Sequence, residues 1–91
     1  MAHTFEELVE KQRAADAAHD QVKGLRNTYG SPTRETWTEA QTETYETAVR
    51  AWRDLARDTQ SAVSEYARDE GRPRADVEAD VEEAATAPPA P

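Results

Sequence analysis

The chain has 91 residues, of which 36% are hydrophobic and 33% are charged, and its formal net charge is −8. A chain of this length forms one small domain and buries only about 60% of its unfolded surface, so a deep active-site cavity is not expected. The negative charge argues against direct nucleic-acid binding, because phosphate binding needs clustered lysines and arginines. The chain has no cysteine, which excludes disulfides, a thiolate nucleophile and sulfur-ligated zinc.

The sequence also argues against a membrane protein. No apolar run approaches the roughly 20 residues that cross a bilayer, and the first residues include two glutamates where a signal peptide is basic and then apolar. These features predict a cytoplasmic protein with no membrane contact. Arginine outnumbers lysine and alanine is abundant, a composition typical of high-GC genomes that indicates an actinobacterial or actinophage origin.

A first helix is predicted over residues 5–29. Thr4 and Glu7 form a capping box, in which each side chain accepts a hydrogen bond from the backbone N–H of the other residue. Small or apolar residues then recur at alternating spacings of three and four, the pattern of a helix with one buried face. Gly30 ends the helix, and Pro32 prevents its continuation.

A second helix is predicted over residues 37–70, because Thr36 and Glu39 have the spacing of another capping box. Its apolar face is wide enough for a globular bundle. Gly71 ends it, and Pro73 is suited to the first position of a further helix, where its missing N–H costs nothing.

The third predicted helix is short and covers residues 74–86, with Val77 and Val81 on one stripe. We therefore expect an all-α fold with a single helical domain over residues 1–86. The remaining residues, 87–91, are alanine and proline and are predicted to form a disordered tail.

The two long helices are predicted to fold back on each other as an antiparallel hairpin. Counting from the turn places Ala15 opposite Trp52 and Leu8 opposite Thr59, so small side chains face large ones. Because the second helix is about ten residues longer, its last two turns, including Tyr66, have no partner in the first helix.

This overhang has two possible covers. Either the third helix turns back so that Val77 and Val81 lie on Val63 and Tyr66, or a second copy of the chain covers these residues. An isolated helix pair of this size has a free-energy balance near zero. A dimeric four-helix bundle is therefore one of the two predicted assemblies.

One charged residue, Lys11, falls in the otherwise apolar seam of the first helix. A cation in a seam costs stability unless it is neutralised or reaches solvent. Asp58 or Gln12 is a candidate partner for it. The alternative is that the ammonium group extends past Leu55 into water.

The candidate partner-binding residues lie at the two ends of the predicted hairpin. Trp37 begins the second helix off its main seam, and an exposed tryptophan is a natural anchor for a partner. Val63 and Tyr66 lie on the overhang and are the other two candidates.

Reactive groups are few. Asp16, His19 and Asp20 share one face of the first helix, a set that could bind a divalent metal or transfer protons. The face lies off the seam, and His3 is too distant in sequence to form a ligand pair with His19, so we interpret the set as a solvated surface. We predict no catalytic, metal-binding or cofactor-binding residue, and no enzyme activity.

Part of the chain resembles a group of known proteins. Segments 37–41, 45–48 and 50–56, which read WTEAQ, YETA and RAWRDLA, look like small helical proteins of unknown function from Streptomyces and related actinobacteria. The resemblance covers about a third of the chain. It implies a helical fold and carries no function that can be transferred.

Two functional hypotheses follow. The first is a non-enzymatic helical interaction or scaffold protein that binds itself or another protein. The second is an acidic inhibitor or nucleic-acid mimic, derived from a phage, that binds a basic protein surface. Its acidic surface would consist of Asp76, Glu78, Asp80, Glu82 and Glu83.

Overall fold

The computed structural model describes residues 3–30 and 37–87. These residues form three α-helices and no strand, so the all-α prediction with three helices is confirmed. The helices are α1 (Phe5–Tyr29), α2 (Glu39–Glu70) and α3 (Arg74–Thr86). The predicted tail lies outside the described residues except for Ala87.

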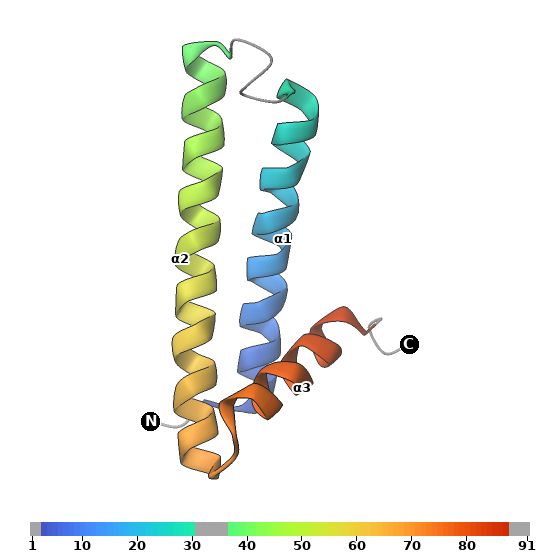
Figure 1. Cartoon of the computed structure of the whole chain (residues 1–91), viewed down its shortest axis with the longest axis vertical. Coiled ribbons are helices and arrows are strands. Elements are labelled where there is room, and N and C mark those ends of the chain that lie inside the picture. Colours follow the sequence, from blue (N-terminus) through green and yellow to red (C-terminus); the bar gives the residue numbers. More distant parts are fainter. Residues whose placement is uncertain (1–2, 31–36, 88–91) are drawn as a thin grey trace.

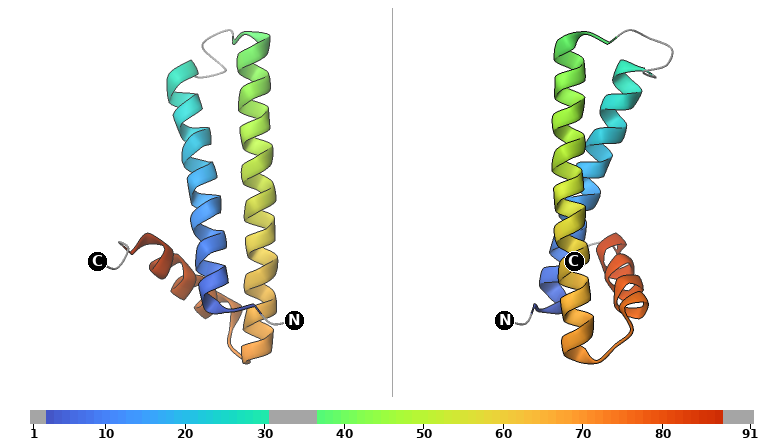
Figure 2. Two further views of the ribbon diagram at one scale, coloured as in Figure 1. Left: turned by 180° about the vertical axis from the view of Figure 1, so that it is seen from behind. Right: turned by 60° about the vertical axis from the view of Figure 1, so that its left-hand side comes forward.

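The two long helices lie side by side along the length of α1, and α3 crosses them at one end (Figure 1). This is the end that contains the start of α1 and the last turns of α2. Views from two other directions show the same arrangement, with α3 on one side of the pair only (Figure 2). The described residues extend over 50 × 30 × 19 Å.

Local capping explains where the helices begin. The Thr4 hydroxyl accepts a hydrogen bond of 3.1 Å from the Glu7 N–H, which is the first half of the predicted capping box. The other half does not form among the described residues, because the Glu7 carboxylate contacts His3. The second helix, however, begins two residues later than predicted. Thr38 and Gln41 form its capping box with hydrogen bonds of 3.1 and 2.9 Å. Two threonines in this stretch are each followed at the third position by Glu or Gln, and sequence alone does not choose between them.

Glycines end both long helices. Gly30 has φ 85° and its N–H donates to the Arg26 carbonyl at 2.9 Å. Gly71 is left-handed at φ 64°, and the Arg72 N–H after it donates to the Ala67 carbonyl at 2.9 Å. Glycine adopts these angles without the steric cost that a Cβ adds.

The predicted register of α1 against α2 was wrong by about one helical turn. Lys11, and not Leu8, lies beside Thr59, whose hydroxyl donates to the Lys11 carbonyl at 3.3 Å. Trp52 stacks on His19, one turn beyond Ala15, with ring centroids 4.4 Å apart. Because α2 begins later than predicted, the connection is longer and each residue of α1 faces a residue further along α2.

The core lies where all three helices meet. Six residues with exposed fractions of 4% or less form it: Leu8, Ala62, Val63, Ala67, Val77 and Val81. Phe5 and Tyr66 pack at its edge, with ring centroids 6.3 Å apart. Of the two covers predicted for the overhang, α3 is therefore the one present, because its two valines lie against α2 and α1.

Arginines hold α3 in place at both ends. Near its start, Arg74 donates to the Ser64 hydroxyl at 2.9 Å and to Glu78 at 3.3 Å. Near its end, the Arg13 guanidinium of α1 donates to the Ala84 and Ala85 carbonyls at 3.2 and 3.4 Å. The helix is thus tied to both long helices.

Candidate functional site

Trp37 lies just before α2 and is half-buried. Its ring stands edge-on between Tyr29 and Tyr45, with centroid distances of 5.5 and 5.0 Å. The indole Nε1 is buried and has no hydrogen-bond acceptor among the described residues. In this structure Trp37 therefore joins the ends of α1 and α2 and does not project into solvent as the predicted anchor would.

The other two candidate partner-binding residues belong to the core region. Val63 is 1% exposed beneath α3, and Tyr66 is half-buried against Phe5. The prediction that Val63 contacts a partner required an uncovered overhang. Because α3 covers it, Val63 is not accessible in this structure.

The five acidic residues of α3 differ in their surroundings. Asp80 receives a hydrogen bond of 2.7 Å from Arg72, and Glu78 is 3.3 Å from Arg74. The hydrogen bond with Asp80 raises the pKa of Arg72. Asp76, Glu82 and Glu83 are exposed and take part in no ion pair among residues 3–30 and 37–87. The predicted acidic surface is thus partly neutralised by the chain itself.

The Asp16, His19 and Asp20 set does not converge on one point. The Asp16 carboxylate accepts a hydrogen bond of 2.9 Å from Gln12, and Asp20 lies 3.4 Å from Lys23. The His19 ring stacks on Trp52 at an interplanar angle of 18°. Within the described parts of the chain, no three His, Asp or Glu side chains are grouped so that they could hold a metal ion.

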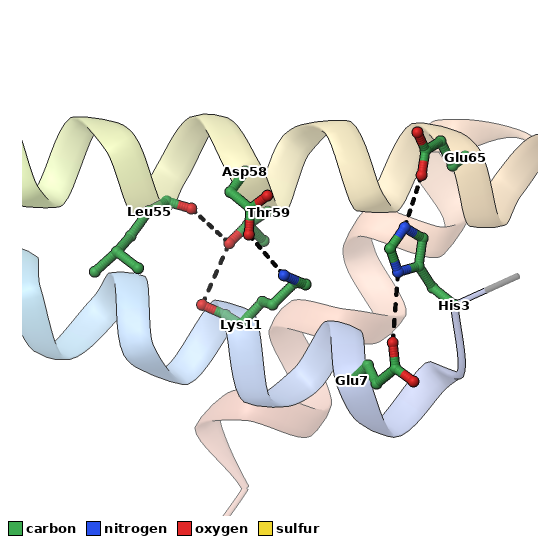
Figure 3. Close-up of polar contacts among 7 residues, drawn as sticks. All are labelled: His3, Glu7, Lys11, Leu55, Asp58, Thr59 and Glu65. Carbon is green, nitrogen blue, oxygen red and sulfur yellow. Dashed lines mark hydrogen bonds and ion pairs between the residues drawn. The ribbon is translucent and has the colours of Figure 1, made fainter. Parts of the chain in front are cut away.

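At the end of the pair where α1 begins, a histidine links the two long helices (Figure 3). The His3 ring nitrogens lie 2.7 Å from the Glu65 carboxylate of α2 and 3.4 Å from the Glu7 carboxylate of α1. The hydrogen bond to Glu65 is the main cause that raises the pKa of His3, and Glu7 adds to the effect. The sequence does not reveal this contact, because His3 and Glu65 are 62 positions apart.

Lys11 is neutralised across the seam by Asp58, one of its two predicted partners. The ammonium group lies 2.6 Å from the carboxylate (Figure 3). This contact lowers the pKa of Asp58. These charged groups are engaged with one another, which is the arrangement of a structural contact between helices.

A hollow with an uncharged lining lies between α1 and α2, toward the end away from α3. We call it the open groove. Its volume is about 550 Å³. Its lining residues are Gln21, Gly24 and Leu25 of α1 and Thr44, Thr47, Ala48 and Ala51 of α2.

Five of the seven residues that line the open groove are glycine, alanine or threonine. Because these residues are small, a partner's backbone could come close to both helices. None is charged, although a third of the chain is charged. Neither Trp37 nor any residue of α3 lines the groove. The sequence does not reveal the groove, because the hollow depends on how the two helices are rotated against each other.

No protein family, curated protein or solved structure matches the chain. The resemblance to Streptomyces proteins therefore stays a prediction. None of the helices in the described residues is long and apolar enough to span a membrane.

Proposed function

We propose that the chain is a non-enzymatic helical interaction protein, in which a hairpin of two long helices, closed by α3, binds a partner helix in the open groove. The observation that carries this proposal is the uncharged lining of the groove in a chain with a net charge of −8. Removing apolar surface from water yields about 25 cal/mol per Å². Small side chains on both walls let a partner helix approach closely enough to bury that surface.

We propose a non-enzymatic role because both histidines take part in contacts within the chain. The His3 ring is held by two carboxylates, and the His19 ring is stacked on Trp52. A general base must reach the proton that it removes, within about 3 Å of the reacting atom. The His3 nitrogens are thus engaged with carboxylates, and the His19 ring packs against Trp52 between α1 and α2.

The test introduces a charge into the groove. In Ala51→Arg, a guanidinium lies where a partner helix would bury apolar surface, so association should be lost while helicity by circular dichroism stays the same. The matched control is Ser61→Arg, at an exposed position of α2 that does not line the groove. Association is measured as self-association by light scattering and as partner capture on immobilised chain, with partners identified by mass spectrometry.

If Ala51→Arg and Ser61→Arg retain the same associations as the unmodified chain, the open groove is not the binding surface. If Ala51→Arg alone loses one, the assignment holds. Because the side chain of Ala51 is exposed, the substitution leaves the core intact and unfolding does not complicate the comparison.

The acidic inhibitor remains the alternative function. The observation that favours it is that Asp76, Glu82 and Glu83 of α3 take part in no ion pair within the described parts of the chain. A nucleic-acid mimic attracts its target through charge, so capture of basic proteins should weaken as salt screens the carboxylates. Capture that is equal at low and high salt, or unchanged in the Glu82→Gln and Glu83→Gln double variant, argues against this function.

A further inference from the structure

The start of α1 is held on α2 through the imidazole ring of His3. Its Nε2 lies 2.7 Å from the Glu65 carboxylate of α2, and its Nδ1 lies 3.4 Å from the Glu7 carboxylate of α1 (Figure 3). Only 24% of the His3 side chain is exposed, so the ring is fixed between the two carboxylates. Both ring nitrogens are therefore used, and by acceptors of the same charge.

This arrangement requires one protonation state of the ring. An ionised carboxylate only accepts hydrogen bonds, and a neutral imidazole has a single N–H to donate. An imidazolium has two N–H groups and donates to both glutamates at once. When the proton is lost, one nitrogen presents a lone pair to a carboxylate, and the attraction between opposite charges disappears. The geometry thus distinguishes the two charge states of His3.

The other charged groups nearby do not replace the charge of His3. Asp58 of α2 is paired with Lys11 of α1 at 2.6 Å. The hydrogen bond from Lys11 lowers the pKa of Asp58, so this carboxylate stays ionised at neutral pH. No charged side chain of α3 contacts the ring among the described residues. His3 is therefore the group of this cluster that is suited to change its charge near neutral pH.

The turn that His3 holds carries part of the edge of the core. Phe5 follows His3 by two residues and packs on Tyr66 of α2, with ring centroids 6.3 Å apart. The intervening residue, Thr4, caps α1, because its hydroxyl accepts a hydrogen bond of 3.1 Å from the Glu7 N–H. A loss of the contact at His3 thus acts directly on the cap of α1 and on this aromatic pair.

We propose that His3 is a proton-dependent latch on the first turn of α1. An imidazolium at His3 holds this turn on α2, and when the proton is lost the turn detaches and Phe5 leaves the edge of the core. The detachment ends within this turn, because Leu8 is fully buried and Lys11 remains paired with Asp58. The latch does not involve the open groove, which lies toward the other end of the pair.

The latch is closed at low pH and opens as the pH rises. The hydrogen bond to Glu65 is the main cause that raises the pKa of His3 above its ordinary value of 6.5. The attached turn therefore holds the proton more tightly than the detached turn does. Detachment occurs as the pH rises through the raised pKa.

The experiment is an NMR titration of the unmodified chain from about pH 5.5 to 8.5. The carbon-bound ring protons of His3 report its charge, and the nuclear Overhauser effect between the Phe5 and Tyr66 rings reports whether the first turn is attached. Both should change with one midpoint above pH 6.5, and the Overhauser effect should fall severalfold. Carbon-bound protons do not exchange with water, so this fall reports a change of conformation.

The variant Glu65→Gln tests which group holds the proton. Its amide has no negative charge, so the midpoint of His3 should fall and the Overhauser effect between Phe5 and Tyr66 should already be weaker at low pH. The matched control is Glu70→Gln, the same change at an exposed position of α2 that makes no contact with His3 among the described residues. It should leave both signals as in the unmodified chain.

Three results overturn the latch. In the first, His3 titrates with the same midpoint in the unmodified chain and in Glu65→Gln. In the second, the Overhauser effect stays constant while His3 titrates, so that the contact with Glu65 is an ion pair that holds no turn. In the third, circular dichroism shows that most of the helicity is lost over the same pH range, which is global unfolding and not the release of one turn.

Discussion

At the level of single residues, His3 joins three parts of the chain. It comes from the segment before α1 and reaches Glu65 of α2 and Glu7 of α1. Asp58, which pairs with Lys11, also lies near: the charge of His3 adds to the effect of Lys11 in lowering the pKa of Asp58. The charged groups around the imidazole are thus mainly carboxylates, which favour its protonated form.

This environment predicts that stability depends on pH. The hydrogen bond to Glu65 raises the pKa of His3 above its ordinary value of 6.5, so the folded chain holds the proton more tightly than the unfolded chain. The contribution of His3 to the free energy of unfolding is complete below pH 6.5 and is lost as the pH rises through the raised pKa. Urea denaturation from about pH 5.5 to 8.5 should show this decline.

The variant His3→Gln should flatten the pH dependence, because the amide carries no proton that titrates in this range. The matched control is His19→Gln, which removes the other histidine and should keep the decline. A decline that is equal in the unmodified chain and in His3→Gln would show that another group causes it.

Thr59 is the one buried polar side chain among the described residues, at 2% exposure. Its hydroxyl donates to the Leu55 carbonyl at 2.8 Å and contacts the Lys11 carbonyl of α1 at 3.3 Å (Figure 3). A threonine at this position therefore fills the seam and also satisfies its own hydroxyl within it. Val would keep the shape and lose the polar contact.

We expect Thr59→Val to lower the free energy of unfolding by about 1 kcal/mol, since a typical hydrogen bond contributes 0.5–1.5 kcal/mol and the backbone carbonyls keep their helical partners. Thr59→Ser keeps the hydroxyl and loses a buried methyl group, which costs about as much. Chemical denaturation measures both. A gain in stability in Thr59→Val would mean that burying the hydroxyl costs more than its contacts return.

At the level of elements, α3 is the helix with the least internal support. It has 13 residues, no side-chain hydrogen bond at its N-cap and no basic residue in its last turn, where Glu82 and Glu83 oppose the helix dipole. A positive charge at the C-terminal end of α3 is instead supplied by α1. Arg13 of α1 donates to the carbonyls at the end of α3 and so supplies its C-terminal cap.

We predict that Arg13→Gln frees the end of α3. Hydrogen exchange of the amides in the last turn of α3, measured by NMR, should quicken severalfold, because both the charge and the fixed guanidinium contacts are lost. Exchange in the middle of α2 should change little. Arg26→Gln is the control, since this exposed arginine of α1 makes no side-chain contact with α3 among the described residues. Equal effects of the two variants would contradict the capping role.

At the level of the whole molecule, α3 completes the core that the two long helices begin. Val77 and Val81 are fully buried against Leu8 and Val63. Away from α3, aromatic contacts join α1 to α2. They are the group of Tyr29, Trp37 and Tyr45 and the His19–Trp52 stack. The molecule thus has an apolar core at one end and an aromatic closure at the other.

This division predicts the effect of weakening the core from α3 alone. Val77→Ala should lower the free energy of unfolding by about 2 kcal/mol, because two buried methyl groups are lost and a cavity remains. Urea denaturation measures the change, and Ala79→Ser, at an exposed position of α3, should cost much less. If Val77→Ala costs no more than Ala79→Ser, α3 does not pack on the long helices in solution.

The sequence by itself determined the number of helices and most of their ends, because capping and termination are local. Thr4, Gly30 and Gly71 act through hydrogen bonds to residues within one or two turns, which spacing alone reveals. The predicted start of α2 was two residues too early, since the sequence offers two overlapping capping boxes there. Asp58 was one of two candidate partners of Lys11, and the alternative was that the ammonium group reaches solvent past Leu55; the spacing did not choose among them.

Only the tertiary structure decided the register of α1 against α2, the burial of Val63 beneath α3, and the existence of the open groove. Each depends on the rotation and offset of helices that are joined by a connection whose length the sequence did not determine. A change of one turn in the register exchanges every facing pair, whereas the pattern of apolar residues along each helix stays the same. The candidate binding surface is therefore a property of the assembled helices, which no single segment encodes.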